Sequence, residues 1–110
     1  MTFFQSEIVQ EEINRIAELQ EKVYSDVFSV PNMNKSEKIE HINLLEELLK
    51  KQEILYFRLN MSDDPEAKAM KQQIIEGASS LGYSRDTDFS QVFKNMNDVI
   101  RRLKDSLDEE

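Results

Sequence analysis

His41 is the only histidine in the chain and the first candidate for metal chemistry. Glu37 lies four residues earlier, so on a helix the two side chains share a face and supply two potential metal ligands. Zinc sites use three or four protein ligands, and a di-iron bundle needs a glutamate three residues before the histidine, where this chain has Lys38. We therefore expect no metal and no other cofactor, and we interpret His41 as a partly exposed surface residue.

Pairs of adjacent carboxylates are the next candidates for chemistry. They are Glu11 and Glu12, Glu46 and Glu47, and Asp63 and Asp64. General acid–base catalysis needs two carboxyl groups held in one cleft with different pKa values, whereas adjacent residues on a helix point in different directions. The chain has no cysteine and its two glycines stand apart, which excludes thiolate chemistry and glycine-rich phosphate loops. We expect no enzymatic activity.

The composition indicates one helical domain over residues 1–110. Hydrophobic residues make up 39% and charged residues 33% of the chain, and no stretch reaches the roughly 20 apolar residues that span a bilayer. The chain opens without a signal peptide, so we expect a cytoplasmic protein that does not bind membranes. The net charge of −8 disfavours direct binding to nucleic acid and favours a protein partner with a basic surface.

Four helices are predicted, over about residues 6–28, 36–61, 65–81 and 88–107. The first and last carry apolar stripes that repeat every 3.6 residues on average. These stripes are Val9, Ile13, Ile16, Leu19, Val23 and Val27, and Phe89, Phe93, Met96, Ile100, Leu103 and Leu107. Short connections favour antiparallel neighbours, so the expected fold is all-α. It is either a four-helix antiparallel bundle or a long helical hairpin with two further packed helices.

Residues that favour helix ends lie at the borders of these segments. The first helix can begin at Thr2 or Ser6, the second at Asn34 or Ser36 with Glu37 completing a capping box, the third at Asp64 followed by Pro65, and the fourth at Asp88 with Gln91. Gly82 is placed to end the third helix. The last three residues, Asp108 to Glu110, read as a frayed acidic tail.

Five side chains are candidates for binding a partner protein: Phe3, Phe4, Tyr56, Phe57 and Arg58. Phe3 and Phe4 can form a hydrophobic hook or an N-terminal staple onto the first helix. Tyrosine and arginine are enriched at interface hot spots, yet a central helix of a bundle would bury the same aromatic rings. The segment from Ile54 to Met61 is apolar nearly all round, so either several helices cross there or a second chain covers it.

The run Phe3-Phe4-Gln5-Ser6-Glu7-Ile8-Val9-Gln10-Glu11-Glu12 resembles the opening of a small helical family found chiefly in cyanobacteria and described as a domain of unknown function. The resemblance continues from Glu37 to Asp64 and from Gln91 to Lys104. This chain differs in the longer polar stretch from Tyr83 to Asp88, which affects the spacing of the last two helices. The resemblance implies a cyanobacterial cytoplasmic protein with no established catalytic residues.

Three functions follow as hypotheses. The first is a protein-binding adaptor or regulator, for instance of a nucleic-acid-processing enzyme whose basic surface it could occupy. The second is a structural homo-oligomer that buries the segment from Ile54 to Met61 between copies. The third is a small-molecule or metal binder in the bundle core.

Overall fold

The computed structural model describes residues 3–108, and all of its regular elements are helical. They are η1 (Phe3–Gln5), α1 (Glu7–Asp26), η2 (Val30–Asn32), α2 (Lys35–Met61), α3 (Pro65–Ser80) and α4 (Phe89–Asp108). The prediction of an all-helical fold is confirmed, since no strand is present between residues 3 and 108. The suggested cap at Thr2 and the last two residues of the acidic tail lie outside the described residues.

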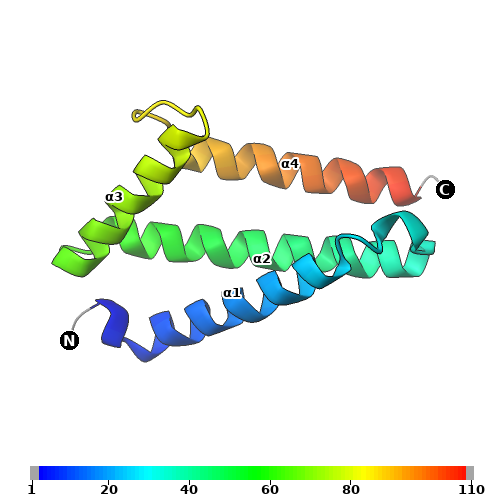
Figure 1. The fold of residues 1–110 in the computed structure, drawn as a ribbon, viewed down its shortest axis with the longest axis horizontal. Coiled ribbons are helices and arrows are strands. Elements are labelled where there is room, and N and C mark those ends of the chain that lie inside the picture. The colour runs from blue at the N-terminus through cyan, green and yellow to red at the C-terminus, as the bar shows by residue number, and fades with distance from the viewer. Residues whose placement is uncertain (1–2, 109–110) are drawn as a thin grey trace.

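The long helix α2 is the centre of the arrangement (Figure 1). Helices α1 and α4 run antiparallel to α2 and flank it on either side, and each packs along it. Helix α3 crosses one end of the layer, where it contacts α2 and η1. The molecule measures 48 × 31 × 21 Å, so it has one broad face toward the viewer in Figure 1.

The core lies along both sides of α2. Leu19 of α1 has 0% of its surface exposed, and Leu59 of α2 is also buried. On the other side of α2, a cluster joins it to α4, with partly buried residues around it. The buried members are Ile42, Leu49, Ile100 and Leu107. Because Ile100 and Leu107 are seven residues apart on α4, the 3.6-residue repeat places them on the same stripe and gives α4 its contact with α2.

Helix ends form through local side-chain chemistry. The Asn34 side chain accepts a hydrogen bond from the Glu37 N–H, and the Asn34 N–H donates to the Glu37 carboxylate, so the expected capping box is confirmed and starts α2. Gly82 adopts φ +98° after α3, where the amides of Gly82 and Tyr83 donate back to the carbonyls of Ser79 and Ala78 in a Schellman motif.

The other predicted starts have mixed outcomes. Asp64 caps α3 and Pro65 takes its first position, as expected, whereas the Ser6 side chain makes no capping hydrogen bond at α1. Asp88 accepts a hydrogen bond from the Ser90 N–H, but the Gln91 amide donates to Asn95 one turn onward. The capping box predicted for Asp88 and Gln91 is therefore wrong, because the Gln91 side chain is hydrogen-bonded to Asn95 on the same face of α4.

Three ion pairs fix how α1 and α4 align with α2. Arg15 Nη2 lies 2.9 Å from Glu47 Oε1, and Arg58 Nε donates to Glu12 Oε1 at 3.1 Å, so both pairs tie the N-terminal half of α1 to α2. Lys104 Nζ lies 2.7 Å from Glu46 Oε2 and joins α4 to α2. Each pair is partly exposed, so its main effect is on register, with a contribution to stability of about 1 kcal/mol or less.

Candidate protein-binding groove

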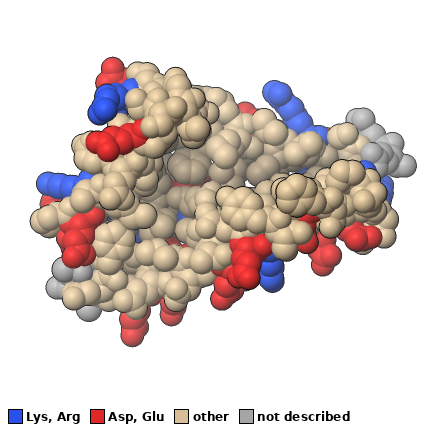
Figure 2. Space-filling view, in the orientation of Figure 1, with Lys and Arg blue, Asp and Glu red and all other residues tan. Residues whose placement is uncertain are grey.

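An apolar groove runs along α2 between α1 and α4. It consists of three adjoining hollows of about 440, 320 and 300 Å³. The first and second share Gln52, and the second and third share Leu45 and Leu103, so they follow one another along the same side of α2. We call this surface the groove. Figure 2 shows the corresponding face, hollowed between its helices and with few charged side chains at its centre.

Helix α3 closes only one end of the groove. Ile74 of α3 and Phe89 and Phe93 of α4 line the first hollow together with Tyr56 of α2. The middle hollow has no residue from α3 among its lining side chains, and aliphatic groups from α2 and α4 form most of its surface. In a closed four-helix arrangement a fourth helix would cover this stretch of α2, because a helix apolar on a broad face packs between its neighbours.

Helix α4 exposes the groove's most accessible apolar side chains. Met96, Val99 and Leu103 are exposed by 46%, 52% and 44%, and all three line the middle hollow. They lie beside the Phe93–Ile100–Leu107 stripe, so the apolar face of α4 is wider than the part that α2 covers. Fully burying side chains of this kind stabilises a complex by roughly 1.5–3 kcal/mol each. Because these three side chains stay about half exposed, much of this stabilisation is still available to a partner.

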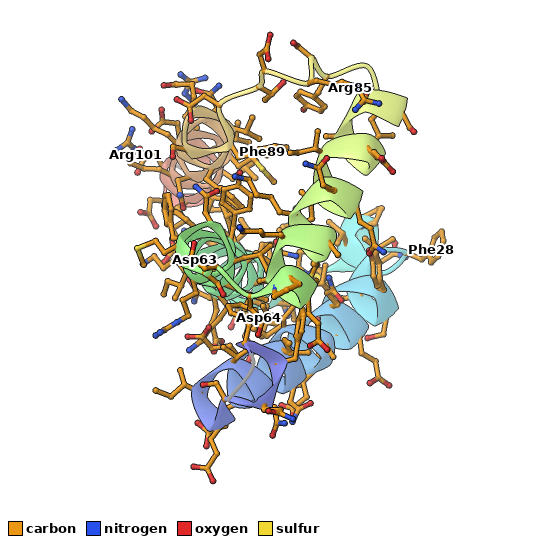
Figure 3. All side chains as sticks on the ribbon, turned by 90° about the vertical axis from the view of Figure 1, so that its left-hand side faces the viewer. Phe28, Asp63, Asp64, Arg85, Phe89 and Arg101 are labelled. Carbon is orange, nitrogen blue, oxygen red and sulfur yellow. The ribbon has the colours of Figure 1, made fainter. Side chains whose placement is uncertain are left out.

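Two further apolar groups lie outside the groove's lining. Phe28, after α1, is 89% exposed, and Figure 3 shows it pointing away from the helices on the side of α2 that carries α3. On α2, the exposed residues Ile54, Phe57 and Met61 follow the 3–4 spacing of one helical stripe. None of these three lines any of the hollows that form the groove.

The structure places Phe3 and Phe4 within the chain's own packing. Both rings are half-buried, and they contact each other edge-on with their centroids 5.0 Å apart. The 3-10 turn that carries them packs against α1 and α3. Their predicted role in binding a partner remains a prediction.

Tyr56, Phe57 and Arg58 point in different directions. Tyr56 lines the groove, with its ring 5.2 Å from Phe89 and 5.9 Å from Phe93, whereas Phe57 is more exposed and Arg58 pairs with Glu12 of α1. Burial, and then the neighbouring Asp88 carboxylate, raises the pKa of the Tyr56 hydroxyl. The five candidate residues therefore form no single surface. Tyr56 alone among them lies in the groove.

Sequence reasoning missed the α4 stripe of Met96, Val99 and Leu103 as a surface. Two of these residues belonged to the predicted core stripe of the last helix. The signal was the breadth of that apolar face, which is wider than one neighbouring helix covers.

The interpretation of His41 as a partly exposed residue is wrong. Its exposed fraction is only 8%, because Asp26 at the end of α1 lies beside it and Leu103 and Leu107 of α4 line the same hollow. Its buried Nδ1 atom has no hydrogen-bond partner among the described residues and lies 3.8 Å from Asp26 Oδ2. Glu37 is exposed and engaged in the α2 cap. Within residues 3–108, no group of three potential metal-ligating side chains occurs.

Charge differs between the two walls of the groove. Helix α1 carries six acidic and two basic residues, a net −4, and α4 carries four basic and three acidic residues, a net +1. Figure 2 shows acidic side chains along the edge formed by α1. Between α2 and α4, the hydrogen bond from Lys104 lowers the pKa of Glu46. The groove is thus apolar inside, with acidic side chains along the edge formed by α1.

No helix in the described part of the chain is both long and apolar enough to cross a bilayer. No curated protein matches the chain, and no solved structure matches it. A protein family matches residues 1–107, which is nearly the whole sequence. The chain therefore belongs to the family described as Domain of unknown function (DUF1825).

Proposed function

We propose that this protein is an adaptor or regulator that binds another protein by taking one of its helices into the groove. The observation that supports the proposal is the uncovered middle of the groove, where Met96, Val99 and Leu103 remain exposed beside Leu45 and Leu48. Helix-in-groove recognition uses anchors spaced three and four residues apart, which suits a groove that follows a helix axis.

The borders of the groove define the chemistry of the partner helix. Its apolar stripe would replace water on α2 and α4, and basic side chains on one flank would lie along α1 beside exposed acids such as Glu18 and Glu21. An enzyme with a basic surface, such as one that processes nucleic acid, presents side chains of this kind. The protein would then act by occupying a surface and not by catalysis, in the cytoplasm of a cyanobacterium.

A capture experiment with matched variants tests this function. Val99→Asp places a charge in the groove, and Met61→Lys places one on an 80% exposed residue elsewhere on the surface. We expect the wild-type chain and Met61→Lys to capture a cellular protein that Val99→Asp does not capture. A peptide of its basic amphipathic helix should bind the purified chain in a calorimetric titration, more weakly as salt rises. If no protein discriminates between the two variants, or if the peptide binds both equally, the proposal is wrong.

A structural homo-oligomer is the second candidate function. The exposed stripe of Ile54, Phe57 and Met61 on α2 favours it, since these three exposed apolar residues lie on one face of the helix. Light scattering on wild type and Met61→Lys tests it. The candidate requires an oligomer that the lysine dissociates, and a monomer or an oligomer indifferent to the lysine excludes it.

A further inference from the structure

We infer that a second copy of this chain occupies the groove, so that α4 of each copy lies in the groove of the other beside its α1. The inference rests on the proposed function in one respect: the groove is a surface that receives a helix. It names the occupant that this surface takes when no other protein is bound.

The first reason is that α4 itself has the stripe that the groove requires. Met96, Val99 and Leu103 follow the 3–4 spacing and are each about half exposed. They neighbour the aliphatic side chains of Leu45 and Leu48 on the floor of the groove. Two copies brought face to face would bury both sets at once, because a symmetric dimer uses each surface twice.

The second reason is charge. Arg102 is exposed on α4, and Glu21 is exposed on α1. Neither of them makes an ion pair with any described residue. Both lie in the C-terminal halves of helices that run in the same direction (Figure 1). A two-fold axis parallel to α2 places α4 of one copy, which carries Arg102, against α1 of the other copy, which carries Glu21.

The alternative axis is disfavoured by the same charges. A two-fold axis perpendicular to α2 within the interface would place the two acidic α1 walls against each other, and like charges in an interface oppose association. Arg102 of the second copy brings to α1 a cation that no described acid already pairs, whereas Arg101 and Lys104 are engaged with Asp98 and Glu46. Charge therefore favours this orientation of the second copy.

The third reason is area. The face that carries the groove measures 48 by 31 Å in outline. A stable complex of standard size buries roughly 800 Å² on each partner. The face is therefore large enough for an interface of that size.

Sedimentation equilibrium of the full chain, from about 1 to 200 µM, tests the inference over the range in which a micromolar complex dissociates. We expect a monomer–dimer equilibrium for wild type. Val99→Asp should raise the dissociation constant at least about tenfold, since it buries an unpaired charge at the interface centre. Leu81→Lys, at an 82% exposed residue outside the lining of the groove and outside the Ile54–Met61 stripe, should leave it unchanged within about twofold. Circular dichroism confirms that the variants keep their helices.

A charge-swap pair then tests the orientation. Arg102→Glu should weaken the dimer, and adding Glu21→Arg to the same chain should restore much of the loss, because the two walls exchange charge. A chain that stays monomeric throughout the range overturns the inference. A dimer that Met61→Lys dissociates and Val99→Asp does not also overturns it, as does a swap with no recovery.

The two hypotheses fail separately. If the chain is a monomer and Val99→Asp still abolishes binding of a cellular partner, the proposed function is supported and the dimer is wrong. If Val99→Asp weakens a dimer but no cellular protein distinguishes the variants, the dimer is supported and the proposed function is wrong.

Discussion

The backbone N–H of Phe3 donates a hydrogen bond of 2.6 Å to Oδ2 of Asp64, across 61 positions of sequence. The other oxygen of the same carboxylate accepts from the Glu66 N–H at 3.0 Å and caps α3. One side chain therefore starts a helix and holds the N-terminal turn against it. Ala67, one turn into α3, is fully buried at 0% exposure.

Replacing this carboxylate should have two effects that can be measured separately. Asp64→Ala removes the cap and leaves the Phe3 amide without its acceptor, so we expect a loss of about 2 kcal/mol in the free energy of unfolding. Urea denaturation measures this loss, and hydrogen exchange at Phe3 measures the release of the turn. Asp63→Ala changes an exposed neighbour and serves as the control. Equal losses in the two variants would contradict the double role of Asp64.

Leu19 anchors the α1–α2 pair because it has no exposed surface. Leu19→Ala leaves a cavity between the two helices, and we expect it to destabilise the protein by about 2–5 kcal/mol. Tyr24→Ala, in the same helix but at a largely exposed residue, should change stability by less than about 0.5 kcal/mol. Thermal and urea unfolding of both variants give the comparison. A small loss for Leu19→Ala would place the core of this pair elsewhere.

The two glycines should respond to alanine in opposite directions. Gly77 lies inside α3, where an added Cβ would meet nothing within 4 Å apart from its chain neighbours and its own helix backbone, so Gly77→Ala should stabilise the chain by about 0.5–1 kcal/mol. Gly82 also has free space, but its φ of +98° is costly for alanine, so Gly82→Ala should destabilise by about 1 kcal/mol. Calorimetric melting of the two alanine variants separates the backbone effect from packing. Melting temperatures that shift in the same direction for both variants would contradict the prediction.

The Lys104–Glu46 pair predicts a dependence of stability on pH. The hydrogen bond from Lys104 lowers the pKa of Glu46 in the folded chain from its ordinary value of 4.5. A carboxylate with a lowered folded pKa contributes stability above its unfolded pKa, and the contribution is lost as the pH falls through the folded pKa. We expect Lys104→Gln to cost about 0.5 kcal/mol at neutral pH and nothing under strongly acidic conditions.

Urea unfolding between neutral and acidic pH measures this difference. The control is Lys94→Gln, which removes an exposed lysine that makes no ion pair with the described residues. A loss for Lys104→Gln that persists when Glu46 is protonated would show that the lysine acts through its aliphatic chain and not its charge.

Features determined by local sequence could be predicted. The 3.6-residue stripes place α1 and α4, and short-range chemistry explains the ends at Asn34, Asp64 and Gly82. These signals involve residues within one or two turns of each other. For that reason they do not depend on how the helices pack.

Features determined by packing could not be predicted. The burial of His41 depends on Asp26 at the end of α1 and Leu107 near the end of α4 lying beside it, and the spacing from Glu37 to His41 contains no information about that. The Arg15–Glu47 pair joins residues 32 apart and requires the register of α1 on α2. The groove depends on α3 crossing one end of the layer, which its thin apolar face does not specify.

The attachment of α4 has a consequence for the order in which the molecule opens. Within residues 3–108, its extensive helix contacts are all with α2, whereas α2 also holds α1 and α3. An exposed loop connects α4 to α3. Helix α4 can therefore unfold as a separate cooperative unit while the α1–α2 hairpin stays intact. Amide protons of α4 should exchange with solvent before those of α1, and each opening would expose the whole α2 side of the groove.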